Sequence, residues 1–464
     1  MQKPVSSVPS TIASPPGPRG IPILGNVIQV LRNEPLQYYT ALWQKYGDLV
    51  RLKLGNMNGY LVAHPAYVHH ILVKNQKNYI KGRGYDGFRL LVGQGLVTSE
   101  GELWQQQRKL MQPSFTPNAI SGYTDLMVDV IQQMLARWEK AAQQGDTLNM
   151  DDEMMRLTMS VIGKAMFSID LSEELTEVGE AFHIAFDFIP DHTMNPLSLP
   201  ISVPLPQHRR FQHAMEVING FISDRIAEGR RSQESKNLFS ILLRATDEET
   251  GQGMSEQQLR DEAITLFFAG FETTARSLTW AWYLITRHSD VQQKLEAEAD
   301  AVLGNRAPVT GDLYNLIYTH QVVDETLRLY PPTAMLARQN LADDTLGDYP
   351  IPAGSMILPS PFLVHRHPDF WPDPERFDPE RFTPENSADR PKYAYIPFAS
   401  GPRVCIGNNF ALLEMVLAIA MISARFRLQP EDRNPIDFTL RGTLHPTRPL
   451  LVKLEQREPV TRAE

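Results

Sequence analysis

The stretch Phe398-Ala-Ser-Gly-Pro-Arg-Val-Cys405-Ile-Gly407 contains the only cysteine among the 464 residues of this chain. Small and turn-forming residues precede the thiol, so the backbone can fold tightly around whatever Cys405 faces. Residues 410–420 are apolar on nearly every side, which predicts a buried helix directly after this stretch. Cys405 should therefore lie in a loop leading into a helix N-terminus, where free N–H groups and the helix dipole favour a thiolate.

A single cysteine cannot form an internal disulfide and does not make a zinc site. The thiol could be a catalytic nucleophile, an axial ligand of a haem iron or an inert buried group. The pattern Phe-x-x-Gly-x-Arg-x-Cys-x-Gly resembles the cysteine loop of the cytochrome P-450 family at every fixed position. This resemblance implies that Cys405 ligates haem iron, that Phe398 contacts the haem and that Arg403 pairs with a haem propionate.

A second motif lies in a long predicted helix that begins at the capping box Ser255-Glu-Gln-Gln258 and ends near His288. Its centre reads Ala269-Gly-Phe-Glu-Thr, with polar residues inside an apolar run. Glu272 could be an ordinary helix-surface residue, or a buried acid that relays protons together with the hydroxyl of Thr273. The segment is similar to the family motif Ala-Gly-x-(Asp/Glu)-Thr, which implies that Glu272 and Thr273 are catalytic.

Trp104 and Arg108 are four residues apart and should share one helix face. On spacing alone, a half-buried tryptophan beside a solvated arginine is the favoured interpretation. The family has Trp-x-x-x-Arg at this place, which implies that both side chains meet a haem propionate. The preceding loop, residues 93–99, resembles that of bacterial fatty-acid hydroxylases, which implies that Val92 and Val97 face the substrate cavity.

Glu325 and Arg328 are three residues apart on a predicted helix, where a surface salt bridge is the default interpretation. The family motif Glu-x-x-Arg implies instead a structural cluster with an arginine from a later Pro-Glu-Arg-Phe segment, here Arg381. The segment Pro332–Arg338 is predicted to be an extended strand, from which Arg338 would reach a propionate. The chain should close with a hairpin over residues 439–454. The residues that the resemblance places at the substrate are Val92, Val97, Ala269, Thr333, Ala334, Leu336 and Leu444.

The net charge of −9 and the lack of a basic block argue against a nucleic-acid partner. No linker divides the chain, so we expect a single domain over residues 21–457. Residues 1–20 should form a flexible N-terminus with a Pro-rich hinge, and residues 458–464 a frayed tail. The polar N-terminus lacks an apolar run, which predicts no transmembrane anchor and a soluble, cytoplasmic protein.

The motifs together identify the chain as a member of the cytochrome P-450 family, and the predicted fold is mainly α with a smaller β portion. The resemblance implies haem b, O2 as co-substrate and electrons from NAD(P)H. A separate ferredoxin or flavodoxin with its reductase would deliver them, and the basic residues Lys109 and Arg425 could guide an acidic partner. Some eukaryotic relatives carry a glutamate that esterifies the haem where Ala269 stands, so the haem should be non-covalent. We expect a monomer.

The predicted activity is insertion of one oxygen atom of O2 into a C–H bond of a hydrophobic small molecule. The loop before Trp104 favours a fatty acid as substrate, whereas the apolar pocket residues suit a terpenoid, a steroid or another natural product equally. A peroxide-using or non-oxidative haem protein of the same fold is a different class, as is a haem sensor or electron carrier. None of these would need the pair Glu272 and Thr273. A haem-free structural protein would be colourless.

Overall fold

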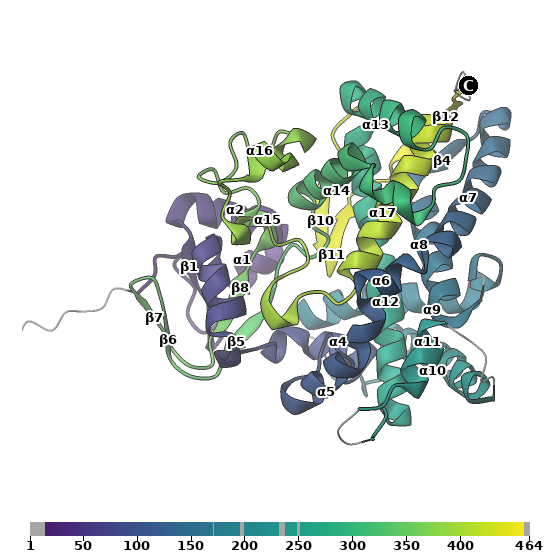
Figure 1. Cartoon of the computed structure of the whole chain (residues 1–464). Helices are drawn as coiled ribbons and strands as arrows, with labels where there is room; N and C mark the ends of the chain where they lie inside the picture. The colour runs from purple at the N-terminus through teal and green to yellow at the C-terminus, as the bar shows by residue number, and fades with distance from the viewer. Residues whose placement is uncertain (1–13, 170, 195–198, 232–236, 248–250, 459–464) are drawn as a thin grey trace, which may run out of the picture.

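A computed structural model describes residues 14–169, 171–194, 199–231, 237–247 and 251–458. Figure 1 shows long helices filling most of the molecule, with the β strands β1, β5, β6, β7 and β8 gathered toward the N-terminal side. This architecture confirms the predicted fold class, mainly α with a smaller β portion. Most of the predicted N-terminal segment and of the predicted C-terminal tail lies outside the described residues.

The α-helices of the described part are α1 (Val27–Arg32), α2 (Pro35–Tyr46), α3 (Pro65–His69), α4 (Asp86–Val92), α5 (Gly101–Met111), α6 (Pro117–Ser121), α7 (Thr124–Gln144), α8 (Met150–Phe167), α9 (Leu171–Met194), α10 (Pro206–Arg231), α11 (Leu238–Arg244), α12 (Glu256–Ile285), α13 (Ser289–Val302), α14 (Ile317–Leu329), α15 (Pro361–Val364), α16 (Pro384–Ser387) and α17 (Asn408–Arg425).

The strands are β1 (Leu49–Leu54), β2 (Met57–Val62), β3 (Tyr79–Ile80), β4 (Thr147–Asn149), β5 (Arg338–Asn340), β6 (Asp344–Leu346), β7 (Tyr349–Ile351), β8 (Met356–Pro359), β9 (Phe426–Pro430), β10 (Phe438–Arg441), β11 (Thr443–Pro446) and β12 (Leu451–Gln456). The largest sheet has the order β1-β2-β8-β5-β3, and a second has the order β4-β12-β9. β10 pairs with β11 and β6 pairs with β7, each as a two-stranded antiparallel ribbon.

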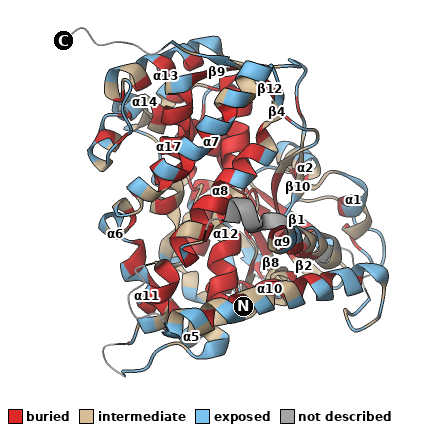
Figure 2. Cartoon of the chain, turned by 90° about the vertical axis from the view of Figure 1, so that its right-hand side faces the viewer, coloured by how far each residue is buried: buried red, intermediate tan, exposed pale blue. Residues whose placement is uncertain are grey.

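Helix α12 runs through the centre of the helical part and forms as the sequence predicts. The Ser255 hydroxyl accepts a hydrogen bond from the Gln258 N–H, and the Gln258 side chain accepts one from the Ser255 N–H, so the capping box is complete. The helix packs chiefly on α8 and also contacts α10, α14 and α17. Figure 2 shows α8, α12 and α17 as the buried interior, with exposed residues concentrated on the outer helices.

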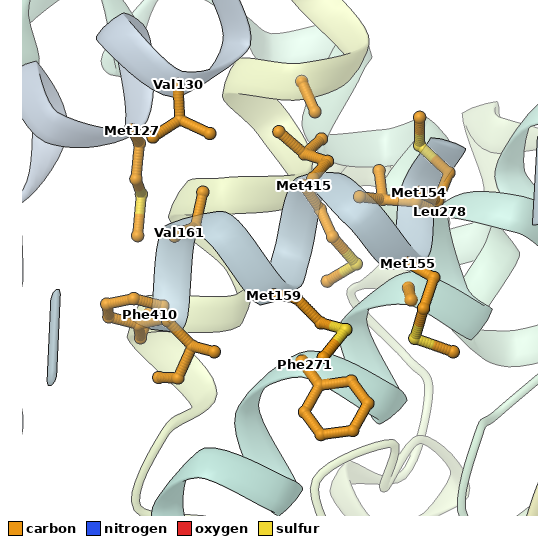
Figure 3. Close-up of a cluster of buried hydrophobic side chains, with 14 of the residues drawn as sticks. Met127, Val130, Met154, Met155, Met159, Val161, Phe271, Leu278, Phe410 and Met415 are labelled. Atoms are coloured by element: carbon orange, nitrogen blue, oxygen red, sulfur yellow. The ribbon is translucent and has the colours of Figure 1, made fainter. Parts of the chain in front are cut away.

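The core between these helices is rich in methionine. Figure 3 shows α8 between its neighbours, with Met159 of α8 next to Phe271 of α12 and Met154 of α8 beside Leu278 of α12, in a cluster that also includes Met155 and Met415 of α17. Methionine is unbranched and adapts to irregular gaps, so it can fill the space where helices cross at different angles. This packing fixes the position of α12, which contains the motif at Ala269–Thr273, relative to α17, which follows the cysteine loop.

The sheets join segments that are far apart in the sequence. β2 pairs in parallel with β8, placing residues 57–62 beside residues 356–359. The chain forms two antiparallel hairpins, β1 with β2 and, where the closing hairpin is predicted, β10 with β11. β12 belongs to neither of these hairpins, because it pairs with β4 and β9 instead, so the predicted closing hairpin ends at Pro446.

The prediction of a strand over Pro332–Arg338 is wrong for most of its length. Only Arg338 belongs to a strand, and the residues before it have no regular ladder. Pro332 has no N–H to donate, and the backbone bonds of this segment go to scattered partners: the Leu336 N–H donates to the Pro359 carbonyl, and the carbonyls of Pro332 and Ala334 accept from the N–H groups of Leu444 and Phe362. The residues from Pro332 to Arg338 nevertheless alternate between buried and partly exposed, as residues of a strand do.

Within the described residues, α17 is the one helix long and apolar enough to meet the length and composition of a membrane span. It is mostly buried and packs on α7, α12, α13 and α14, as expected of a core helix.

Candidate active site

The loop around Cys405 is held by its own backbone and by a close approach to the helical turn His70–Lys74. The Cys405 N–H donates to the Phe398 carbonyl at 3.0 Å, and α17 begins three residues later, with Gly407 at its N-cap. Gly401 has φ of +71°, and a Cβ atom there would overlap the carbonyl oxygen of Leu72. The loop therefore needs glycine at this position, as the sequence predicts from its turn-forming composition.

The Cys405 side chain is exposed, although neighbouring protein atoms partly desolvate the sulfur. Burial raises the pKa of the Cys405 thiol, while the Gly407 N–H and the Arg108 guanidinium act in the opposite direction. This desolvation opposes the effect that the sequence predicts for the helix N-terminus. A metal ion at the sulfur atom would deprotonate the thiol directly.

Trp104 and Arg108 both reach the cysteine loop from α5. The Arg403 guanidinium lies 3.9 Å from the centroid of the Trp104 ring, a cation–π contact, and Arg108 Nη1 donates to the Val404 carbonyl at 2.9 Å. Arg403 Nη1 also donates to the Ser99 carbonyl at 2.8 Å. The predicted shared face of Trp104 and Arg108 thus brings both residues to the segment that contains Cys405.

Lys81, at the end of β3, joins this region although no sequence motif marks it. Its ammonium group is buried and donates to the Val97 carbonyl. Burial and the guanidinium groups of Arg403 and Arg338 hold the pKa of Lys81 well below its ordinary value. Only the position of its neighbours in three dimensions could have revealed this residue.

Positive charge exceeds negative charge in this region. Burial and the repulsion from Arg338 lower the pKa of Arg403 to about 10, although Glu100 forms an ion pair with Arg403. Lys81 and Arg338 therefore lie near Arg403 with Glu100 as the carboxylate that offsets them. An accessible thiol beside a cluster of buried cations fits haem b, which carries two propionate carboxylates to balance such charges.

Beyond its N-terminal end, α12 is buried except near its centre. From Asp261 to Ile285 every residue is buried except Ala269, Gly270 and Thr273. The Thr273 hydroxyl donates to the Ala269 carbonyl at 2.8 Å, four residues earlier on the same face. A helix that is buried over most of its length but partly exposed at one turn is expected to line an internal space at that turn. The sequence predicts the substrate pocket at the same place, next to Ala269.

The Glu272 carboxylate points away from that opening into a buried polar network. Its side chain is 2% exposed, and Arg276 Nε donates to Oε1 at 2.9 Å. The Thr443 hydroxyl on β11 donates to the same oxygen at 3.0 Å. The interpretation of Glu272 as a helix-surface residue is therefore excluded by its burial.

The residues predicted to line the substrate pocket divide into two groups. Val97, Ala269 and Thr333 are partly exposed, as expected of side chains next to an internal space. The other four are buried within the apolar core. Val92 belongs to the main cluster, and Ala334, Leu336 and Leu444 belong to the clusters next to the sheets. Met335 and Ala337, which the sequence analysis did not single out, alternate with them and are partly exposed.

Glu325 and Arg328 form a fully buried pair on α14, both with 0% side-chain exposure. Arg328 donates to both carboxylate oxygens of Glu325 and to the carbonyls of His365, Pro374 and Arg376. Arg381 Nε lies 3.4 Å from Glu325 Oε1. The structure thus brings together the three residues expected to form a structural cluster.

The two basic residues suggested as guides for an electron donor are already paired within the chain. Lys109 Nζ lies 2.9 Å from Asp247 Oδ2, and Arg425 Nη1 lies 3.2 Å from Glu139 Oε1. Both basic side chains are about half exposed.

With its mainly helical fold, its cysteine loop and its opened central helix, the chain belongs to the cytochrome P450 family. The family model described as Cytochrome P450 matches residues 15–454. Members of this family bind haem b through a cysteine thiolate, use O2 and receive electrons from a redox partner, and Cys405 is the only cysteine of this chain. The chain is thus a haem-thiolate monooxygenase, and the sensor, electron-carrier and haem-free alternatives are set aside.

The relatives include proteins of Streptomyces. The chain is 36% identical to cyclooctat-9-en-7-ol 5-monooxygenase of Streptomyces melanosporofaciens, over 91% of this chain and 90% of that protein. It is 35% identical to cyclooctatin synthase of the same organism, over 89% of each chain. It is 30% identical to pentalenene oxygenase of Streptomyces avermitilis, over 97% of this chain and 99% of that protein.

Proposed function

We propose that this cytochrome P450 monooxygenase oxygenates a terpenoid. The observation that carries the proposal is that three relatives of full-length similarity are named for cyclooctat-9-en-7-ol, cyclooctatin and pentalenene, which are terpenoid compounds. These relatives favour the terpenoid alternative over the fatty acid that the loop at residues 93–99 suggests. The partly exposed residues at the opening of α12 are small or apolar, which also suits a hydrocarbon skeleton without a charged group.

In this proposal the cations near Cys405 hold the haem propionates. Cys405 is the axial ligand, Phe398 packs beside the loop, and five further residues bind the propionates or orient those that do: Lys81, Trp104, Arg108, Arg338 and Arg403. When bound, the haem supplies activation of O2, and the thiolate increases electron density at the iron. Ala269 has no carboxyl group, which is consistent with haem held non-covalently.

Glu272 and Thr273 are proposed to control protons. The Thr273 hydroxyl lies at the opened turn of α12 and is oriented by its bond to the Ala269 carbonyl. Glu272 holds a carboxylate one residue away, inside the core, where it can accept a proton and pass it on. Arg276 orients the Glu272 carboxylate through the bond to Oε1.

The pocket residues are proposed to orient the substrate and exclude water. Val97, Ala269 and Thr333 would contact it, while the four buried members of the predicted set (Val92, Ala334, Leu336 and Leu444) would support the wall from behind. A ferredoxin or flavodoxin with its reductase is the proposed electron source. We also retain as proposals a single domain over residues 21–457, a monomeric state, and a soluble protein of the cytoplasm.

The substrate class is tested by absorption titration of the purified haem-loaded protein with pentalenene and, separately, with palmitic acid. Displacement of an iron-bound water by substrate shifts the haem from low to high spin. A shift with pentalenene alone, followed by O2-dependent oxygenated product with NADPH and a ferredoxin system, supports the proposal. A shift and product with palmitic acid alone would overturn the terpenoid assignment in favour of a fatty-acid substrate.

A further inference from the structure

The carboxylate of Glu272 receives three contacts at one oxygen atom. Arg276 Nε and the Thr443 hydroxyl donate to Oε1 at 2.9 and 3.0 Å, and His445 Nε2 lies 3.3 Å from the same atom. Thr443 Oγ1 lies 3.0 Å from His445 Nε2 as well. The hydroxyl therefore bridges the carboxylate and the imidazole, which also approach each other directly.

The three contacts differ in whether they can exchange a proton. A guanidinium stays protonated in proteins, so Arg276 orients the carboxylate but cannot pass a proton to it. The Thr443 hydroxyl can accept and donate at once, and thus conduct a proton without storing it. An imidazole gains and loses a proton near neutral pH. His445 has 15% side-chain exposure against 2% for Glu272, so it lies between the buried carboxylate and solvent.

The formally charged groups around this contact come from three elements. On α12, Glu272 is negative and Arg276 is positive, and on α8 Asp151 forms an ion pair with Arg276. Thr279 adds only a neutral hydroxyl, which bonds to Asp151 at 3.2 Å. The two carboxylates exceed the single guanidinium by one charge, and a proton on His445 of β11 makes the group neutral.

The hairpin that presents His445 is fixed to α12. Thr443 and His445 are two residues apart on β11, so their side chains share one face of the strand. Leu444 between them is buried in an apolar cluster, and its carbonyl accepts a bond from Trp280 Nε1 of α12 at 2.8 Å. This buried bond holds the hydroxyl and the imidazole in register with Glu272.

We propose that His445 supplies protons to Glu272, directly or through the Thr443 hydroxyl, and so connects the proposed proton-relay acid to solvent. In each transfer an N–H bond of the imidazolium breaks and an O–H bond forms at Glu272, and water then returns a proton to the imidazole. No electron moves. His445 is a positioning residue that acts through Glu272, and the inference rests on the proposed function of that carboxylate.

The contact itself is tested without turnover, by NMR titration of His445 in the diamagnetic reduced carbon monoxide complex. The His445→Gln variant assigns the resonance. In the Glu272→Gln variant the titration midpoint of His445 should fall by on the order of one pH unit, because the neighbouring negative charge is lost. An unchanged midpoint would overturn the coupling between the two side chains.

The proton-supply role is tested by the pH profile of coupling, measured as product formed per NADPH consumed. In His445→Gln the coupling should fall several-fold and lose its dependence on pH between about 5 and 8. Thr443→Val should lower coupling while Thr443→Ser retains it. His213→Gln is the matched control, since His213 is a well-exposed histidine on α10.

A wild-type coupling profile in His445→Gln would overturn the inference. The proposed function fails separately, if the wild-type protein gives no O2-dependent product from any substrate of the proposed class. The NMR titration still tests the contact in that case. Thr443→Ser guards against a folding artefact, because it keeps the hydroxyl and removes only a methyl group.

Discussion

Glu262 on α12 is a carboxyl group held in a nearly water-free position behind the loop at residues 93–99. Its Oε2 accepts a bond from the Leu96 N–H at 3.0 Å, while Oε1 has no hydrogen-bond partner among the described residues. Burial, opposed by that N–H and reinforced by the charge of Asp261, raises the pKa of Glu262 to about 8. The carboxyl group is therefore mostly protonated at neutral pH.

The raised pKa makes the contribution of Glu262 to stability depend on pH. The unfolded chain releases this proton near pH 4.5 and the folded chain near pH 8. The stability that the protonated Glu262 contributes is therefore fully present below pH 4.5 and is lost as the pH rises from 4.5 to 8. Glu262→Gln, which stays neutral, should increase the free energy of unfolding at pH 8 by roughly 1–3 kcal/mol. The gain should shrink toward pH 5. Denaturant unfolding at both pH values checks this, and equal gains at both would contradict it.

Substitution of Gly401 tests the close approach of the cysteine loop to the helical turn His70–Lys74. Gly401→Ala would force an L side chain into a positive-φ conformation and onto the Leu72 carbonyl, so we expect a loss of at least about 2 kcal/mol and weaker haem retention. Gly311→Ala is the control, because a Cβ there meets nothing within 4 Å and its φ is not positive. Thermal melting with haem content measures both, and equal effects of the two substitutions would refute the account.

At the scale of single elements, α14 and the segment at residues 379–382 are joined by a buried ion pair. Removing one charge from such a pair leaves the other uncompensated. Glu325→Gln should therefore lower the free energy of unfolding by about 3–5 kcal/mol. Glu380→Gln removes the exposed pair with Lys294 in the same segment and should cost less than about 1 kcal/mol. Similar losses in denaturant unfolding of the two variants would show that Glu325 is not a structural centre.

Helix α12 carries the opening that should admit substrate. Ala269→Phe would fill space at the opened turn, so pentalenene binding should weaken by a factor of about ten or more, while the protein remains folded and loaded with haem. Absorption titration measures the binding. Ala281→Gly, further along α12 and buried in the core, is a control that alters the helix away from the opening. Unchanged pentalenene affinity in Ala269→Phe would place the substrate elsewhere.

Elements with strong local signals could be predicted from sequence. The capping box at Ser255 and the long apolar run predict the start and the approximate length of α12. The segment before Arg338 could not be predicted as unpaired, because pairing depends on which strand lies alongside. The pairing of β12 could not be predicted for the same reason, because its partners β4 and β9 come from distant parts of the chain.

At the scale of the whole molecule, the proposed haem site is assembled from segments that are widely separated in sequence. Cys405, Arg403 and Trp104 could be predicted because each lies in a recognisable motif. Lys81 and Glu100 could not, since their role depends on the neighbours that the fold brings to them. The same holds for His445, which resembles any hairpin histidine until the structure places it beside Glu272.

Two opposing effects act on the pKa of the Cys405 thiol, and they arise at different scales. Local sequence supplies the N–H of Gly407, which lowers this pKa, whereas the fold brings protein atoms close to the sulfur, and their desolvation raises it. A metal ion at the sulfur atom would favour the thiolate.

The most direct test of the central claim is the absorption spectrum of the reduced carbon monoxide complex, recorded for the wild-type protein and for Cys405→His. Ligation by Cys405 predicts the red-shifted Soret band of a thiolate-bound haem in the wild type, and its replacement by an imidazole-type band in the variant. A wild-type protein without the thiolate band, or a variant that keeps it, would contradict the assignment of Cys405 as the haem ligand.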